Sequence, residues 1–366
     1  MATAYSIEEE QLSPAACFSL LAIVLLGTRF VQGFIFWGGA SRRLIYDYQD
    51  TAGIDHALKL DFQSAGFVAG KLTHALPGTL WIQAPLEWAL QYPDLIVLSV
   101  WFWTIAELLV GLFLIFGFVT RLAAFASIGL NVALMLIFGW MGSTCLDEWT
   151  MAVSGVAMSG AVYLAGGGRI SLDNMVGRTD WAWRNGWANW LLSGPLPTRS
   201  ARVGGALLAA FAVLFTVGSY NILFGAVVSP LHARVTFHKH HIALSNVVVS
   251  SDGGVTLDAY VDAGPDTGAA YIIDVRLIDA EGNAVSHWDG ATLAALPDTS
   301  IQNLYPYVWA SRFRTEKIGI SGNTGAKARI VLPAAGSDAS QPGRDLVLVL
   351  EAINGATWRA AASSGG

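Results

Sequence analysis

The stretch LIVLSVWFWTIAELLVGLFLIFGF, Leu95–Phe118, decides the fold of this chain. Nearly all of its residues are apolar, and Glu107 is its one acidic or basic residue. A helix needs roughly 20 apolar residues to cross a bilayer, because the hydrocarbon core is ~30 Å thick. The stretch therefore predicts a transmembrane helix that carries a carboxylate inside the membrane.

Four other runs flank this helix and have a similar composition. Hydrophobic residues make up 54% of the chain and charged residues only 13%, which is typical of a membrane protein with a soluble part. The further predicted spans are Cys17–Trp37, Leu122–Trp140, Trp149–Ala165, which is the shortest, and Gly204–Val228.

Beyond about Pro230 the hydrophobic pattern changes. Apolar residues come in short runs such as Val255–Val261 and Tyr271–Leu277, with Gly- and Asp-rich turns between them, as in a β-domain. We therefore predict an α-helical membrane bundle of four helices plus a fifth anchoring helix, followed by an extracytoplasmic β-sandwich. The predicted parts are residues 1–203 with an outer loop over 38–94, and residues 204–366 with a helix over 204–228 and the sandwich over 233–358.

The charges of the connections predict the orientation. The segment 166–203 holds five arginines against two aspartates, and cytoplasmic loops are enriched in Lys and Arg. The chain is therefore expected in the cytoplasmic (inner) membrane, as a multi-pass protein with its C-terminal domain on the periplasmic side. Loop 38–94 is too long for a structureless connection and should form short helices over the bundle. The net charge of −6 argues against a nucleic-acid partner.

Polar residues inside the predicted spans are candidates for function, because an ionisable group in the membrane is costly. Arg29, Glu107 and Asn131 have similar predicted depths, and Gln32 lies one turn from Arg29 on the same helix face. Two interpretations remain open, a structural Arg29–Glu107 ion pair and a ligand site, and the two are compatible.

Arg42 and Arg43 follow Gly38-Gly39-Ala40-Ser41, just beyond the predicted end of the first helix. They are expected either to bind lipid phosphate or to form an anion site, since guanidinium groups suit oxyanions.

Cys145 lies in a short polar break between two apolar runs. The only other cysteine, Cys17, is predicted at the opposite membrane face, much farther away than the roughly 4–7 Å between the Cα atoms of a disulfide. Cys145 is therefore either a small packed residue or a thiol available for chemistry. Asp147 and Glu148 would raise its pKa unless a cation offsets them.

His238, His240 and His241 stand together after the fifth predicted helix. Alternate strand residues share a face, so His238 and His240 could point together. No cysteine or acid stands beside them as a third ligand, so we favour a solvated strand edge and predict no metal. The sequence also lacks a dinucleotide-binding fingerprint.

Several motifs carry a resemblance to a known family. Arg29–Phe34 with Trp37–Arg43, Gly142–Trp149 and Gly166–Asp173 resemble the DoxD subunit of thiosulfate:quinone oxidoreductase, within the wider DoxX-like membrane family. The region after about Arg202, one helix and a β-domain, is similar to the DoxA subunit. The resemblance implies a fused chain of sulfur metabolism that oxidises thiosulfate to tetrathionate and gives two electrons to a membrane quinone, diffusible or bound.

Within that resemblance we assign roles by inference from the residues. Arg42 and Arg43 would bind thiosulfate, Arg29, Gln32 and Asn131 would bind the quinone head group, and Cys145 and Glu107 would be catalytic. A transporter or anchor for a sulfur anion, and a quinone oxidoreductase acting on sulfite or an organic thiol, remain alternatives. A homo-oligomer is compatible with the sequence.

Overall fold

A computed structural model describes most of the chain. The described residues are 14–45, 48–49, 55–56, 62–79, 81–138, 146–177, 186–224, 239–265, 268–307, 310–334 and 345–364. They fall into two compact units. The first comprises Met1–Ile45, Phe102–Ala133 and Met151–Gly218, and the second comprises Tyr46–Trp101, Leu134–Thr150 and Ser219–Gly366.

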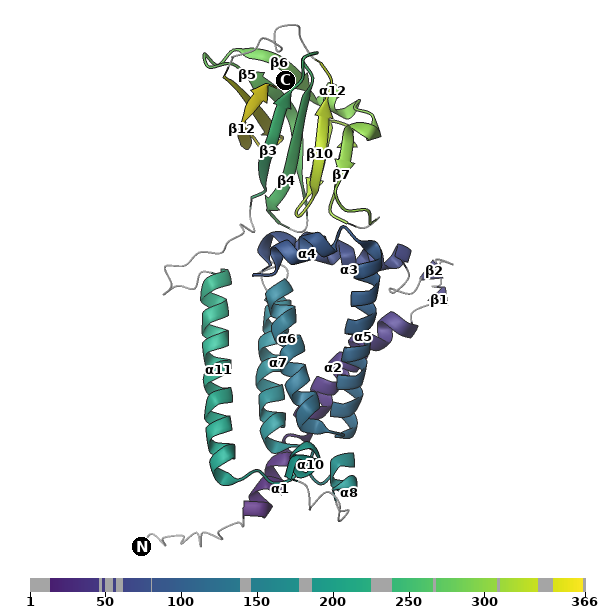
Figure 1. Cartoon of the computed structure of the whole chain (residues 1–366), viewed down its shortest axis with the longest axis vertical. Helices are drawn as coiled ribbons and strands as arrows, with labels where there is room; N and C mark the ends of the chain where they lie inside the picture. Colours follow the sequence, from purple (N-terminus) through teal and green to yellow (C-terminus); the bar gives the residue numbers. More distant parts are fainter. Residues whose placement is uncertain are drawn as a thin grey trace, which may run out of the picture. The chain divides into compact units, whose positions relative to one another are not determined.

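Helices make up the first unit (Figure 1). Some of them continue into the second unit. The helices are α1 (Pro14–Val24), α2 (Leu26–Ile45), α5 (Pro93–Phe116), α6 (Thr120–Phe138), α7 (Leu146–Ala165), α8 (Leu172–Val176), α10 (Gly186–Leu191) and α11 (Thr198–Phe224).

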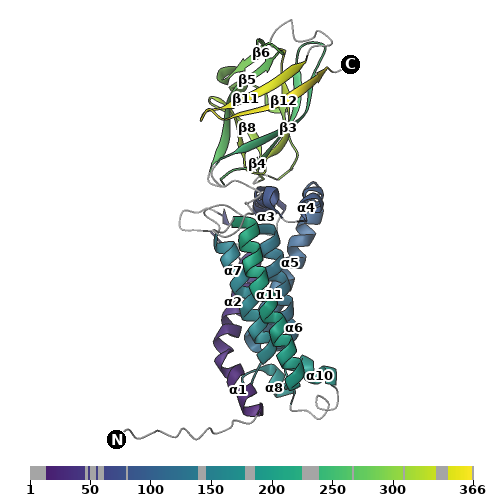
Figure 2. The same ribbon diagram turned by 90° about the vertical axis from the view of Figure 1, so that its left-hand side faces the viewer.

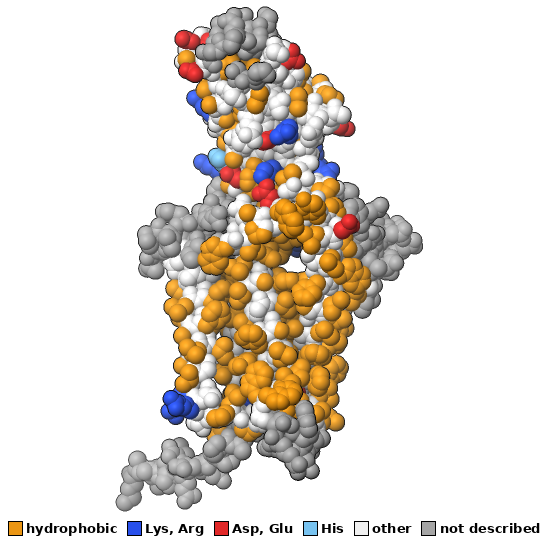
Figure 3. All heavy atoms as spheres, in the orientation of Figure 1, with side chains coloured by type: hydrophobic (Ala, Val, Ile, Leu, Met, Phe, Trp, Pro, Cys, Tyr) orange, Lys and Arg blue, Asp and Glu red, His pale blue; other side chains and the backbone are white. Residues whose placement is uncertain are grey.

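Three of the described helices are long and apolar enough to cross a membrane: α5, α6 and Thr198–Asn221 of α11. Trp149–Ala165 of α7 is a shorter apolar helix. Figure 3 shows hydrophobic side chains over the visible face of the helical part, and Phe102, for example, is 73% exposed. An apolar exterior of this extent fits a lipid environment, so the predicted membrane-helical part is confirmed.

The first predicted span differs in the structure. It consists of two helices, α1 and α2, which meet at Leu25, and α2 continues past the predicted end at Trp37 to Ile45. Arg42 and Arg43 therefore belong to the last turn of α2 and not to the loop in which we expected them. Cations are favourable there, since the C-terminal end of a helix carries partial negative charge.

The C-terminal part is a β-domain, as predicted. Its strands pair in the order β7-β10-β4-β3-β12-β11-β5-β9-β8, with β6 added beside β5. Figure 2 shows the sheet curling round. The strands are β3 (His241–Val249), β4 (Val255–Ala263), β5 (Ala269–Ile278), β6 (Ala284–Asp289), β7 (Ile301–Asn303), β8 (Phe313–Glu316), β9 (Gly319–Asn323), β10 (Lys327–Leu332), β11 (Leu346–Ala352) and β12 (Thr357–Ser364).

One curled sheet replaces the two separate sheets that a sandwich would have. Its end strands approach each other: Asn303 of β7 donates through Nδ2 to the Phe313 carbonyl oxygen of β8 at 2.9 Å and accepts from the Phe313 amide at 2.7 Å. The domain is thus close to a barrel. Burial alternates along β4, and the fully buried Trp288 and Leu277 lie in the core that the sheet encloses.

Short helices in loop 38–94 are also confirmed. They are α3 (Phe62–Ala75), the 3₁₀ helix η1 (Leu76–Gly78) and α4 (Gln83–Ala89), and two short strands, β1 (Tyr48–Gln49) and β2 (Asp55–His56), precede them. We call α3, η1 and α4 the cap helices.

Candidate functional site

Glu107 is the centre of a buried polar group in the first unit. It is 5% exposed and accepts hydrogen bonds from Arg43 Nη1 at 2.6 Å and from Trp103 Nε1 at 2.6 Å. Arg43 Nη1 also donates to Thr104 Oγ1 at 3.1 Å. Trp103, Thr104 and Glu107 share one face of α5 because they are three or four residues apart. Helix α2 therefore brings a guanidinium group onto a carboxylate and a hydroxyl of α5.

Glycines permit this contact. A Cβ atom on Gly111 of α5 would lie 2.5 Å from the Trp37 backbone nitrogen, and one on Gly33 of α2 would lie 2.9 Å from the Gly111 carbonyl oxygen. Helix α2 thus crosses α5 with the two backbones in near contact. Gly39 continues this face, since a Cβ there would lie 3.5 Å from Glu107 Oε2. The distance between the helices, and with it the reach of Arg43, depends on these small residues.

A second buried polar group joins α2, α6 and α7. Gln32 Nε2 donates to Ser127 Oγ at 3.1 Å, and Ser127 Oγ shares a hydrogen bond of 2.7 Å with Ser159 Oγ. Asn131 Nδ2 donates to the Ser127 carbonyl oxygen at 2.8 Å. Gly155 leaves room for the amide, because a Cβ there would lie 2.3 Å from Asn131 Oδ1.

One acceptor in this second group has no partner among the described residues. Gln32 Oε1 is buried without a hydrogen bond to any of them, and Gln32 as a whole is 2% exposed. An unpaired buried amide oxygen is costly, and rotation of the amide by 180° would leave the NH₂ group unpaired instead. The site can therefore accept a hydrogen bond from a ligand hydroxyl or, after the flip, donate one to a ligand carbonyl.

Arg29 has different partners from those we predicted. Its guanidinium group donates to the carbonyl oxygens of Gly167 and Ile170, the latter at 2.8 Å. Glu107 is paired with Arg43 instead, so the expected Arg29–Glu107 ion pair is wrong. Gly117 has φ +65°, and a Cβ there would lie 2.5 Å from Arg29 Nη1. Arg29 holds the turn after α7 against α2, which is a structural contact.

The Gly166–Asp173 motif builds the rest of this end of the bundle. Asp173 is fully buried and accepts from the Val119 amide at 2.6 Å, the Thr120 amide at 3.0 Å and Ser193 Oγ at 2.5 Å. Its carboxylate therefore caps the start of α6. The fully buried Arg121 donates to the backbone carbonyls of Tyr163, Trp190 and Gly194. The bonds of Asp173, and those of Arg29 to Gly167 and Ile170, give these three residues of the motif a structural role.

The four residues expected to bind or reduce quinone thus divide among three places. Glu107 lies with Arg43, Gln32 and Asn131 meet at Ser127, and Arg29 lies at the turn after α7. The prediction missed Trp103, Thr104, Ser127 and Ser159. Helical spacing of three or four residues from Glu107 and Asn131 could have identified Trp103, Thr104 and Ser127. Ser159 belongs to another helix, and no sequence spacing relates it to them.

The structure describes the predicted anion site but not the predicted thiol. Arg42 is exposed at the end of α2, whereas the Arg43 side chain is only 20% exposed and is engaged by Glu107. Cys145 lies outside the described residues, and so does His238. Cys17 is exposed on α1.

The histidines and acids of the β-domain form no metal site among the described residues. His241 Nδ1 lies 2.5 Å from Asp262 Oδ1, while the His240 ring lies against Gly264. Burial lowers the pKa of His240, so this imidazole favours its neutral form.

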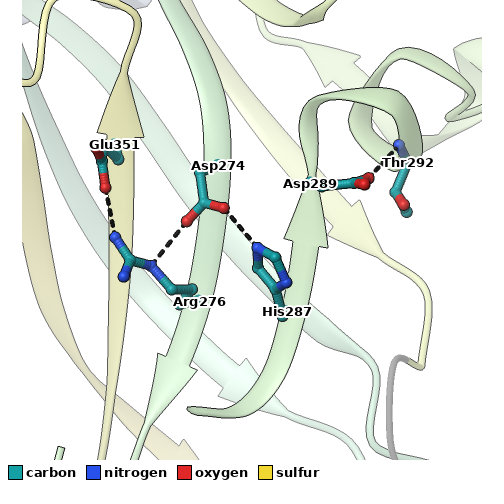
Figure 4. Close-up of polar contacts among 6 residues, drawn as sticks. All are labelled: Asp274, Arg276, His287, Asp289, Thr292 and Glu351. Atoms are coloured by element: carbon teal, nitrogen blue, oxygen red, sulfur yellow. Dashed lines mark hydrogen bonds and ion pairs between the residues drawn. The ribbon is translucent and has the colours of Figure 1, made fainter.

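A charged network lies on β5, β6 and β11 (Figure 4). Asp274 pairs with both His287 and Arg276, and Arg276 also pairs with Glu351. The network places two carboxylates, Asp274 and Glu351, around one guanidinium group and one imidazole, and partly exposed pairs of this kind contribute little to stability. Asp289 acts separately by capping α12 (Gly290–Ala294) through the Thr292 amide at 2.8 Å. The network does not present a cation to an anionic ligand.

Comparison with known families accounts for almost all of the chain. Residues 24–199 match the family model described as TQO small subunit DoxD, and residues 223–361 match the one described as TQO small subunit DoxA. TQO stands for thiosulfate:quinone oxidoreductase. No solved structure matches the chain. The chain belongs to both families in tandem, as a fused DoxD–DoxA protein of the thiosulfate:quinone oxidoreductase type.

Proposed function

We propose that this protein oxidises thiosulfate to tetrathionate on the extracytoplasmic side of the cytoplasmic membrane and reduces a membrane quinone. Two thiosulfate ions each lose one electron and join through their outer sulfur atoms, and the quinone takes up both electrons and two protons. The tandem match to the two subunit families is the observation that carries this proposal.

Glu107 is proposed to pass protons to the reduced quinone. A buried carboxylate inside a membrane helix is a common proton relay. Arg43 acts as a positioning residue, since it holds the Glu107 carboxylate at 2.6 Å against α2. Gln32, with its unpaired amide oxygen, and Asn131 are proposed to hydrogen-bond the quinone head group.

Arg42 and Cys145 are proposed for the sulfur chemistry. With Arg43 engaged by Glu107, the exposed Arg42 is the cation left to attract thiosulfate. Quinone oxidises the Cys145 thiolate and one thiosulfate together, forming a Cys–S–S–SO₃⁻ adduct and quinol. A second thiosulfate attacks the middle sulfur of that adduct, between the Cys145 sulfur and the sulfonate group. The bond to Cys145 breaks, so tetrathionate leaves and the thiolate is regenerated, as in thiol–disulfide exchange.

Purified full-length protein should be assayed with quinone and a panel of thiosulfate, sulfite and a small organic thiol. We expect quinol with thiosulfate. Arg42→Ala should raise the thiosulfate KM and leave the quinone KM unchanged, with Arg314→Ala, an exposed arginine of the β-domain, as the control. Quinol formed only with sulfite or the thiol would reject the substrate. Thiosulfate uptake into proteoliposomes without quinol would favour a transporter.

A further inference from the structure

The cap helices contact the β-domain within the second unit. Lys327 of β10 forms an ion pair with Glu87 of α4, and its ammonium group also lies 5.4 Å from the centre of the Tyr260 ring of β4. Gln83 Nε2 of α4 donates to Tyr260 Oη at 3.5 Å. One cation of the β-domain therefore touches both an acid of the cap and an aromatic ring, and a cation over an aromatic face is a favourable contact.

Deeper contacts lie beside this ion pair. The amide of Ser311 donates to Thr73 Oγ1 of α3 at 3.0 Å, and Thr73 is fully buried. Gly325 has φ +85°, and a Cβ there would lie 2.0 Å from the Thr73 carbonyl oxygen. The backbones of α3 and the β9–β10 turn are thus in direct contact, which only glycine permits at that position.

Buried residues on both sides form the centre of this contact. Leu76, Pro77 and Gly78 of η1 are buried, and η1 packs against β4. Tyr305 of the β-domain is 1% exposed, and burial together with the nearby Glu87 carboxylate raises its pKa. An interface with a buried centre and a polar rim resembles a specific protein–protein contact.

The two sides of this contact match different family models. All three cap helices lie within residues 24–199, which match DoxD, whereas β4, β10 and Ser311 lie within residues 223–361, which match DoxA. We propose that the cap helices are the surface that binds the DoxA-type β-domain, and that the same surface joins DoxD to DoxA where the two are separate chains. The inference does not depend on the reaction proposed above.

The full chain can test this surface. A site-specific protease sequence is inserted between α11 and β3, and the full chain is cut in isolated membranes. After the cut, non-covalent contacts alone hold the β-domain. We expect the wild-type fragment to sediment with the membranes. Glu87→Lys and Lys327→Glu should each raise the released fraction at least fivefold, the factor for ~1 kcal/mol of charge repulsion. The double variant should restore retention.

Glu281→Lys, an exposed change in the β5–β6 turn, is the control for charge reversal. As a second measurement, Thr73→Cys with Ser311→Cys should form a disulfide that keeps the cut fragment attached in denaturing detergent until reduction, and neither single variant should do so. Loss of the wild-type fragment on cutting, equal release from all charge variants, or absence of the cross-link would overturn the proposed surface.

Discussion

At the scale of single residues, Glu107 is the buried carboxylate of the bundle to which we assign a proton-transfer role. Its two oxygens are occupied by donors from α2 and α5, namely Arg43 and Trp103. Removing one member of a buried ion pair typically costs ~3–5 kcal/mol, because the other charge is left unpaired. Arg43→Ala should therefore harm folding as well as activity. Glu107→Gln is the milder change, because it keeps the size of the side chain and one acceptor oxygen for Arg43 or Trp103.

We predict that Glu107→Gln still inserts into the membrane but reduces quinone about 100-fold more slowly, the usual minimum for removal of a general acid or base. Quinone reduction by purified variant protein measures this effect. Glu281→Gln, on the exposed β5–β6 turn, should keep full activity. Wild-type turnover and quinone affinity in Glu107→Gln would remove Glu107 from the quinone site.

Cys145 allows a second prediction at this scale. Cys145→Ser keeps approximate size and loses the sulfur nucleophile, so it should fold yet fail to reduce quinone with thiosulfate. Alkylation should inactivate the wild type, thiosulfate should slow the alkylation, and mass spectrometry should find a sulfur adduct on Cys145. Cys17→Ser is the matched control and should remain active. Near-normal activity of Cys145→Ser would end the covalent mechanism.

At the scale of elements, the crossing of α2 and α5 places Arg43 over Glu107. Gly33 and Gly111 bring the backbones together, so a methyl group at either position must push the helices apart. Gly129 of α6 is the opposite case, because a Cβ there meets nothing within 4 Å.

Gly111→Ala should destabilise the protein by ~1–3 kcal/mol through overpacking and should slow quinone reduction by displacing Arg43. Gly129→Ala should be neutral or stabilise by up to ~1 kcal/mol, since alanine has the higher helix propensity. Thermal unfolding in detergent, with activity on the same samples, compares them. Equal unfolding temperatures and activities would show that the close crossing has no functional role.

The elements themselves were largely predictable, and their partners were not. Apolar runs identified α5, α6 and α11, and strand and turn patterns identified β4 and β5, because these signals are local in the sequence. Composition placed the end of the first helix at Trp37, but helical bonding continues to Ile45, and that extension transfers Arg43 from the predicted anion site to Glu107. Similarity of depth could not decide whether Arg29 or Arg43 meets Glu107, because depth says nothing about helix rotation.

At the scale of the whole molecule, the predictions concern the orientation of the chain in the membrane and the reaction that it catalyses. The arginines of segment 166–203 favour a cytoplasmic side for that segment. A tag at the C-terminus should then be cut by protease added to intact spheroplasts, whereas a tag inserted within 178–185 should be cut only after lysis. The reverse cleavage pattern would contradict the predicted topology, because it would place the C-terminal domain on the cytoplasmic side of the membrane.

The stoichiometry of the reaction catalysed by the purified protein is the sharpest test of the proposed thiosulfate oxidation. Thiosulfate and a quinone are supplied without other oxidant, and quinol, tetrathionate and remaining thiosulfate are measured over time in one reaction. We predict one tetrathionate and one quinol for every two thiosulfate ions consumed. Quinol formed without tetrathionate, or no quinol from thiosulfate at all, would contradict this prediction.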